Sequence, residues 1–87
     1  MNYFVYILKC ADETLYTGIT VDLEKRIAAH NAGKGAKYTR GRKPVYLFYS
    51  EECADRSSAL RRESEIKKMS KSEKIALTES VKQINPR

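Results

Sequence analysis

The fold of this chain is decided by one stretch near its beginning, Tyr3-Phe4-Val5-Tyr6-Ile7-Leu8-Lys9-Cys10-Ala11-Asp12-Glu13-Thr14-Leu15-Tyr16-Thr17-Gly18-Ile19. Residues 3–10 are rich in β-branched and aromatic side chains, and residues 15–19 form a second short run of the same kind. Residues 11–14 have the polar composition of a turn, so the stretch predicts a β-hairpin. Because side chains alternate along a strand, we expect Tyr6 to share a face with Phe4 and Leu8, and Tyr16 to share one with Gly18.

A helix is predicted directly after the hairpin. Asp22 can cap its first turn, where Glu24 places a favourable negative charge, and Gly33 ends it, so the helix should run from Leu23 to about Ala32.

One side of this helix should face the core. At about 100° per residue, Leu23 and Ile27 define the buried stripe, with His30 beside Leu23 and Arg26 slightly further round. His30 can equally be an ordinary histidine at a helix C-terminus, where partial positive charge is favourable.

The rest of the chain predicts one more strand and two more helices. Val45–Tyr49 follows Pro44 as an apolar strand, and a helix should run from about Arg56 to Met69. Ser70-Lys71-Ser72-Glu73 has the form of a capping box before a helix from Lys71 to about Val81. We expect one α/β (α+β) domain over residues 1–82, a small three-stranded antiparallel sheet flanked by helices, and a frayed tail over residues 83–87.

Glu63 occupies an unusual place on the predicted 56–69 helix. Ala59, Leu60 and Ile66 form its apolar stripe, and Glu63 lies near the middle of that stripe. An unpaired buried carboxylate is costly, so Glu63 should pair with a base, bind a metal or open into a cleft. A core ion pair with Arg26 or Lys67 is the structural alternative.

Size and composition fit a small globular protein. The 87 residues form a single domain with a thin core, and 41% of them are hydrophobic and 32% charged. No signal-peptide pattern and no apolar run of about 20 residues is present, so we expect a cytoplasmic protein with no membrane partner. Cys10 and Cys53 are expected to be reduced and structural, and their spacing from His30 does not indicate a zinc site.

The charge balance favours a polyanionic partner. The net charge is +6, from 17 Lys and Arg against 11 Asp and Glu. The excess is concentrated in residues 33–44, which contain three glycines and no acid and predict a flexible cationic loop. A solvated loop is the simpler interpretation, but the absence of acids favours nucleic-acid contact. The candidate binding residues are Lys34, Lys37, Tyr38, Arg40, Arg42 and Lys43.

These features together resemble the GIY-YIG nuclease superfamily, in particular small stand-alone proteins related to the catalytic domains of excinucleases and of Slx-type endonucleases. Phe4-Val5-Tyr6 stands at the first signature triplet and Tyr16-Thr17-Gly18 at the second. Arg26 and His30 follow with the family spacing, and Glu63 stands at the family's glutamate. The sequence departs from the family at Phe4 in place of glycine, at Thr17 in place of isoleucine, and at Ile19, where some relatives carry lysine.

The resemblance implies metal-dependent hydrolysis of a phosphodiester, and we expect DNA as the substrate, with a link to DNA repair or recombination; the sequence leaves DNA versus RNA open. Glu63 would hold a single Mg²⁺ or Mn²⁺ together with water and phosphate, and Arg26 would bind phosphate oxygens. Water would be the nucleophile, Tyr6 or Tyr16 would act as its general base, and His30 would relay a proton or anchor phosphate. The sequence does not decide between the two tyrosines.

Three hypotheses follow from the sequence. The first is a metal-dependent endonuclease, structure-selective or weakly specific. The second is a non-catalytic nucleic-acid-binding module, or a subunit that cuts only beside a partner protein that supplies specificity. The third is a structural protein whose polar residues satisfy one another, which predicts no salt-sensitive binding to nucleic acid.

Overall fold

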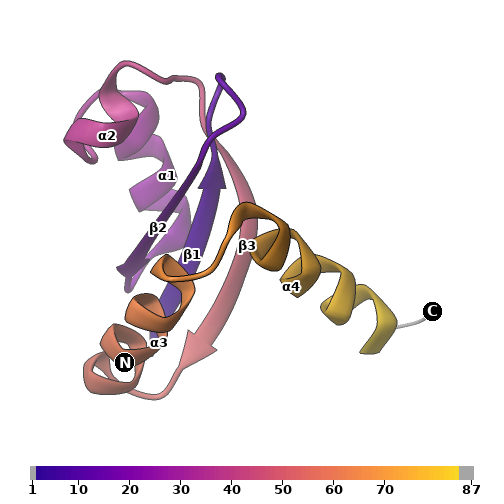
Figure 1. Ribbon diagram of the computed structural model, residues 1–87. Coiled ribbons are helices and arrows are strands. Elements are labelled where there is room, and N and C mark those ends of the chain that lie inside the picture. Colours follow the sequence, from indigo (N-terminus) through magenta and orange to yellow (C-terminus); the bar gives the residue numbers. More distant parts are fainter. Residues whose placement is uncertain (1, 85–87) are drawn as a thin grey trace.

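The computed structural model of the protein describes residues 2–84 and shows a three-stranded antiparallel sheet with helices on both faces (Figure 1). The strands pair in the order β2-β1-β3, which makes β1 central and confirms the predicted fold class. The elements are β1 (Tyr3–Lys9), β2 (Leu15–Thr20), α1 (Leu23–Asn31), α2 (Lys37–Arg40), β3 (Tyr46–Cys53), α3 (Arg56–Lys67) and α4 (Lys71–Ile84).

The hairpin of β1 and β2 has the predicted turn and the predicted alternation. Tyr6 lies opposite Gly18, and Leu8 lies opposite Tyr16, so both tyrosines are on the same face of the sheet. In the turn, the Cys10 amide donates to the Thr14 carbonyl at 2.8 Å. The hydroxyl and amide of Thr14 both donate to the Asp12 carboxylate, which satisfies the polar groups of the turn locally.

Each face of the sheet has its own apolar cluster. Tyr6 and Leu8 of β1 point to the face that α1 covers with Leu23 and Ile27. Val5 and Ile7 of the same strand point to the other face. There they pack against Ala59 and Ile66 of α3, with Met69 and Leu77 at its margin. The period-two pattern of β1 thus supplies both cores of a thin domain.

The starts of α1 and α4 were predicted from capping residues, and the structure confirms them. The Asp22 carboxylate accepts from the Lys25 amide at 3.1 Å and begins α1. At α4, the Ser70 amide donates to Glu73 and the Glu73 amide donates to the Ser70 hydroxyl, which is the reciprocal capping box. Helix α4 continues to Ile84, beyond the predicted end near Val81, and residues 85–87 of the predicted tail lie outside the described residues.

Three details of the prediction were wrong. Leu60 is 38% exposed and does not belong to the buried stripe of α3, which consists of Ala59 and Ile66. Strand β3 runs four residues past the predicted Tyr49, because its pairing with β1 continues to Cys53. The segment expected to be a flexible loop contains α2 and several tertiary hydrogen bonds.

Cys10 is buried and Cys53 is half-buried, and both are free thiols. Over residues 2–84, no helix has the length and apolar character needed to cross a bilayer.

Candidate active site

Tyr6 is the centre of the candidate site. Its side chain is only 1% exposed, and its hydroxyl lies 3.1 Å from His30 Nε2. The Nε–H of Arg26 donates to the same hydroxyl at 3.3 Å. Strand β1 and helix α1 therefore bring together three of the five predicted catalytic residues through direct contacts.

Tyr16 completes an aromatic group around His30. The Tyr16 ring lies 5.3 Å from the imidazole and 6.4 Å from the Tyr6 ring, measured between centroids. Unlike Tyr6, it is only half-buried, and it stands on the edge strand β2. The two tyrosines thus have different environments, which the sequence did not show.

Gly18 makes room for the Tyr6 hydroxyl. A β-carbon added to Gly18 would lie 2.6 Å from Tyr6 Oη and 2.8 Å from Tyr6 Cζ, closer than side chains pack. Since Gly18 pairs directly with Tyr6 across the hairpin, the glycine of the second signature triplet is required by the tyrosine of the first.

His30 is fully buried and is held from both sides of its ring. Its Nδ1 lies 2.7 Å from the hydroxyl of Thr39, at the opposite end of the ring from Tyr6. Gly35 packs so closely on the imidazole that any side chain there would overlap it. Thr39 and Gly35 were missed by sequence reasoning, and the only sequence signal for them was the glycine-rich spacing of residues 33–41.

The shifted pKa values of Tyr6 and His30 favour the neutral form of both side chains at neutral pH. Burial raises the pKa of the Tyr6 phenol above 10.0; Arg26 opposes this, while Tyr16 and the negative charge of Glu63 add to it. Burial, with the charge of Arg26, lowers the pKa of His30 below 6.5. At neutral pH the pair is therefore a phenol beside a neutral imidazole.

Glu63 lies on α3, which packs against β1 and β2 on the opposite face from α1. Its side chain is 18% exposed and pairs with Lys67 Nζ at 3.2 Å, one turn further along the helix. Of the two ion pairs considered from the sequence, the one with Lys67 is therefore present, while Arg26 Nε is engaged with Tyr6. Among the described residues Glu63 makes no hydrogen bond or ion pair with the other four candidate catalytic residues, and its negative charge is the smallest of the contributions to the pKa of Tyr6.

The residues present fit a metal held by one carboxylate. Within residues 2–84, no three His, Cys, Asp or Glu side chains gather closely enough to form a metal cage. Mg²⁺ is commonly bound by one or two carboxylates and otherwise by water and substrate phosphate, so a lone, partly exposed Glu63 meets that requirement. The competing ligand of this carboxylate is the mostly exposed Lys67 ammonium, which is free to move away.

The basic segment is ordered by contacts with the rest of the domain. The Arg42 guanidinium donates to Asp12 at 2.9 Å and to the Tyr38 carbonyl at 2.7 Å, and the Ala11 amide donates to the Arg42 carbonyl. Asn31 pairs with both backbone groups of Val45 and closes the segment at its other end. The segment is thus fastened to the hairpin turn and to α1.

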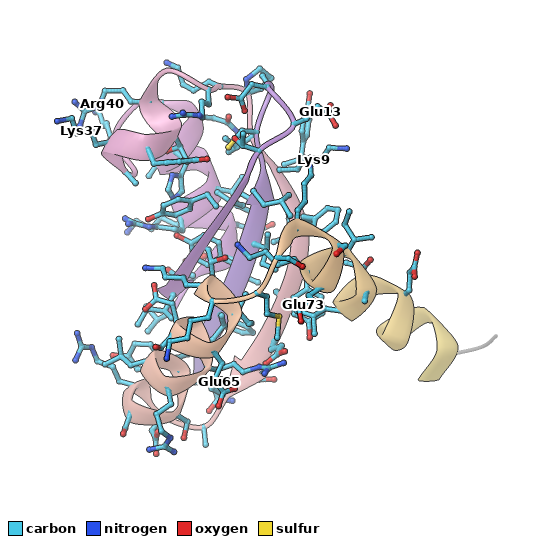
Figure 2. All side chains as sticks on the ribbon, in the orientation of Figure 1. Lys9, Glu13, Lys37, Arg40, Glu65 and Glu73 are labelled. Carbon is cyan, nitrogen blue, oxygen red and sulfur yellow. The ribbon has the colours of Figure 1, made fainter. Side chains whose placement is uncertain are left out.

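The candidate nucleic-acid-binding residues differ in how many contacts their side chains make with the rest of the domain. Lys37 and Arg40 project from α2 away from the sheet (Figure 2), and Lys34 and Lys43 are also exposed. The Tyr38 ring is stacked on Tyr16 at 5.7 Å and has the Arg42 guanidinium 4.1 Å above its centroid. With these two contacts Tyr38 still remains 39% exposed.

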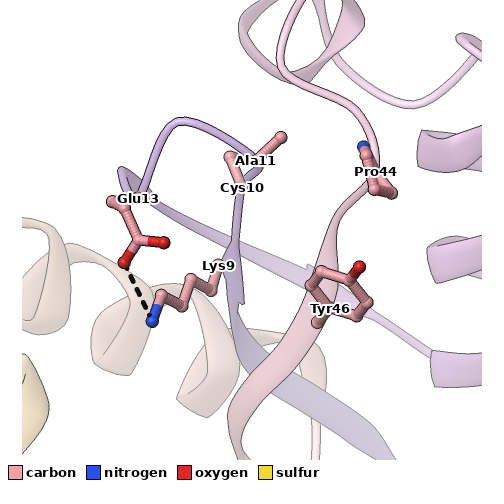
Figure 3. A pocket seen from close by; sticks show the side chains of 6 residues that line it. All are labelled: Lys9, Cys10, Ala11, Glu13, Pro44 and Tyr46. Carbon is pink, nitrogen blue, oxygen red and sulfur yellow. Dashed lines mark ion pairs between the residues drawn. The ribbon is translucent and has the colours of Figure 1, made fainter.

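Among the cavities on the surface of residues 2–84, two are considered for the site. One of about 270 Å³ adjoins Arg26 at the start of α1 and is lined by Thr20, Val21, Asp22, Lys25, Arg26 and Ala29. The other, of about 310 Å³, lies by the hairpin turn between Lys9, Glu13 and Tyr46 (Figure 3). Of the five candidate catalytic residues, Arg26 lines the smaller cavity and none lines the larger one.

Comparisons with known proteins show the family of the chain. The family model described as the GIY-YIG catalytic domain matches residues 2–76. A UPF0213 protein from Staphylococcus haemolyticus is 54% identical over 78 residues, covering 90% of this chain and 95% of the relative. A UPF0213 protein from Natronomonas pharaonis is 55% identical over 76 residues, covering 87% and 89%.

Solved structures agree with the fold as well. The solution NMR structure of a UPF0213 protein from Bacillus halodurans is similar with a TM-score of 0.58 and 46% identity, covering 91% of this chain and 84% of that one. The solution NMR structure of a protein from E. faecalis has a TM-score of 0.65 and 35% identity, covering 93% and 86%. The chain therefore belongs to the GIY-YIG catalytic domain family and, within it, resembles the UPF0213 proteins.

Proposed function

We propose that the protein is a metal-dependent endonuclease that hydrolyses phosphodiester bonds in DNA. The observation that carries this proposal is the environment of the Tyr6 hydroxyl, which has a cationic donor, Arg26, on one side and a neutral imidazole, His30, on the other. A tyrosine that only packs in a core needs one hydrogen-bond partner; a donor together with a proton acceptor suits proton transfer.

Tyr6 is the proposed general base. Its raised pKa makes an isolated phenolate unfavourable at neutral pH, so the phenol acts as a relay. As water attacks phosphorus, Tyr6 Oη takes a proton from the water and gives its own proton to His30 Nε2, 3.1 Å away. The proton finishes on the imidazole, and Arg26 Nε stabilises the partial negative charge on the phenol oxygen during the transfer.

Tyr16 is proposed to orient the reacting groups. It contacts His30 edge-on, and neither of the hydrogen bonds at Tyr6 involves it. Arg26 is proposed to hold nonbridging phosphate oxygens through its terminal nitrogens, since its Nε–H is already engaged with Tyr6. The cavity beside Arg26 provides a place for that phosphate.

Glu63 is the proposed ligand of Mg²⁺ or Mn²⁺, with water and substrate phosphate as the remaining ligands. When bound, the ion supplies positive charge to the scissile phosphate and the leaving oxygen. To hold the ion, Glu63 would give up its pairing with the half-exposed Lys67 ammonium.

The exposed basic residues Lys34, Lys37, Arg40 and Lys43 are proposed to contact the DNA backbone. Such contacts carry no sequence information, so the proposed recognition is of backbone shape rather than of bases. This extends the proposal to structure-selective cleavage in DNA repair or recombination, with any sequence choice supplied by a partner protein.

The decisive test is cleavage of labelled single-stranded, duplex, flap and branched DNA, and of RNA, in Mg²⁺, Mn²⁺ or EDTA. Glu63→Ala should abolish cleavage while it leaves binding in place. Glu65→Ala is the matched control: it removes the same charge from the same helix at a side chain that is 63% exposed and paired only with Arg62. Metal-dependent cutting that survives in Glu63→Ala, or is equally lost in Glu65→Ala, would contradict the proposal.

A second candidate function is supported by the Glu63–Lys67 ion pair and the near-complete burial of Tyr6. Both features fit a nucleic-acid-binding module, or a subunit whose site opens only beside a partner. Wild-type protein that binds DNA with a salt-dependent affinity but cuts nothing in any metal would favour this candidate.

A further inference from the structure

The hydroxyl of Thr39 lies within hydrogen-bond distance of two groups, the Ala36 carbonyl oxygen and His30 Nδ1. The carbonyl oxygen of Ala36 is 3.1 Å away and can only accept a hydrogen bond. His30 Nδ1 is 2.7 Å away on the other side. Thr39 has a single hydroxyl proton; if this proton is given to Ala36, the lone pair that remains faces the imidazole, and His30 Nδ1 must be the donor.

Protonation at Nδ1 also determines the state of Nε2, at the other end of the imidazole. A neutral imidazole protonated at Nδ1 has its lone pair on Nε2, and Nε2 lies 3.1 Å from the Tyr6 hydroxyl. The Tyr6 proton therefore has an acceptor, while the Tyr6 oxygen accepts from Arg26. All hydrogen bonds run in one direction, from Arg26 through Tyr6 and His30 to Thr39 and the Ala36 carbonyl.

The Nε2–H tautomer of His30 leaves the proton of the Tyr6 hydroxyl without a hydrogen-bond acceptor among these partners. With the proton on Nε2, both His30 and Arg26 would donate to the Tyr6 oxygen, and the proton of this buried hydroxyl would have no acceptor among these partners. Thr39 would also have to turn its proton from Ala36 towards Nδ1. The satisfied network is the one with the proton on Nδ1.

We propose that Thr39 is a positioning residue that fixes His30 in the Nδ1–H tautomer, so that Nε2 is free to receive the proton of Tyr6. Gly35 assists, because it lets the backbone close over the imidazole and hold the ring plane. Thr39 is fully buried in the short helix α2, and its hydrogen bond to the site is the one with His30. The catalytic meaning of this inference rests on the proposed nuclease activity, whereas the tautomer itself is a property of the folded chain.

The tautomer can be measured directly by ¹⁵N NMR of the imidazole nitrogens in uniformly labelled protein at neutral pH. The chain has one histidine, so the ring signals belong to His30. The wild type should show a protonated Nδ1 and an unprotonated Nε2. Thr39→Val keeps the shape of the side chain without the hydroxyl and should move the population towards Nε2–H. Thr39→Ser keeps the hydroxyl and should retain the wild-type tautomer.

Cleavage assays on the same proteins give the second readout. Thr39→Val should lower the cleavage rate by about 100-fold, the lower end of what general acid–base catalysis contributes, and Thr39→Ser should restore most of it. An amide ¹H–¹⁵N spectrum of each variant shows that it is folded.

An Nε2–H signal in the wild type, or an unchanged tautomer in folded Thr39→Val, would overturn the inference whatever the activity. A wild type that shows the Nδ1–H tautomer and cuts no substrate would instead refute the proposed nuclease function and leave the role of Thr39 in place.

Discussion

Replacing Gly18 with alanine tests the packing of the site most directly. The new β-carbon would lie 2.6 Å from Tyr6 Oη, and ordinary van der Waals contact begins at 3.4 Å, so the hydroxyl must move by at least about 0.8 Å. The Tyr6–His30 hydrogen bond is already 3.1 Å long, so a shift of that size is large enough to break it. Tyr6 is 1% exposed, so the ring has little free space into which it can move.

The expected cost has two parts. Overpacking a filled core costs about 1–3 kcal/mol, and leaving a buried polar group without its partner costs about 1–3 kcal/mol. The two parts overlap, because moving Tyr6 relieves the clash as it breaks the bond, so we expect Gly18→Ala to lower the free energy of unfolding by roughly 2–4 kcal/mol. Urea denaturation followed by circular dichroism measures this difference.

Gly41→Ala is the matched control. A β-carbon at Gly41 meets nothing within 4 Å, and its backbone φ of −97° suits any residue. We expect this variant to stay within about 0.5 kcal/mol of the wild type. If Gly18→Ala were as stable as Gly41→Ala, the tight contact between Gly18 and Tyr6 would not exist in solution, and the account of the second signature triplet would be wrong.

Two further predictions concern buried polar groups. His30 has a folded pKa below its ordinary 6.5, because burial and Arg26 disfavour its charged form. The unfolded chain therefore takes up a proton first as pH falls, so the free energy of unfolding should decline below about pH 6.5 and level off once the folded pKa is passed. The buried Thr17 Oγ1 has no hydrogen-bond partner within the described part of the chain, so Thr17→Val should raise the free energy of unfolding by about 1 kcal/mol, measured as a higher urea midpoint.

Both measurements have internal controls. The pH series is repeated on His30→Gln, which should show no decline in the same window. Hydrogen bonds from Thr14 and Ser58 hold the pKa values of Asp12 and Asp55 below 3.8, so these carboxyls act only at lower pH. A wild type whose stability does not change through the histidine window, or a Thr17→Val variant less stable than the wild type, would contradict the respective reasoning.

The elements that could be predicted from the sequence are those with local signals. The hairpin turn, the Asp22 cap and the Ser70–Glu73 capping box depend on residues within four positions of one another, and all three are confirmed. Helix α2 was missed because four residues are too few to show a helical period, and no side chain caps its start. The exposure of Leu60 was missed because a helical wheel gives the direction of a side chain but not how far the neighbouring sheet extends.

The sequence allowed the candidate site residues to be named, but it did not allow the hydrogen bonds among them to be predicted. Tyr6, Arg26 and His30 were expected from the resemblance to the GIY-YIG superfamily, and they are in contact. Thr39 and Gly35 act on His30 across an intervening turn, and nothing in their local sequence specifies that contact. The difference between the two tyrosines likewise follows from strand order, which places Tyr6 in the centre of the sheet and Tyr16 at its edge.

The central position of β1 has a consequence for how the domain opens. Strand β1 is paired along both sides, so the backbone around Tyr6 belongs to the part that opens last and should show the slowest amide hydrogen exchange. Thr39 belongs to a helix of four residues, and a hydrogen bond between the Thr39 and His30 side chains joins this helix to α1. Transient detachment of α2 would thus expose His30 while the sheet remains folded. The site would then open by reversible local unfolding, at a lower free-energy cost than global unfolding.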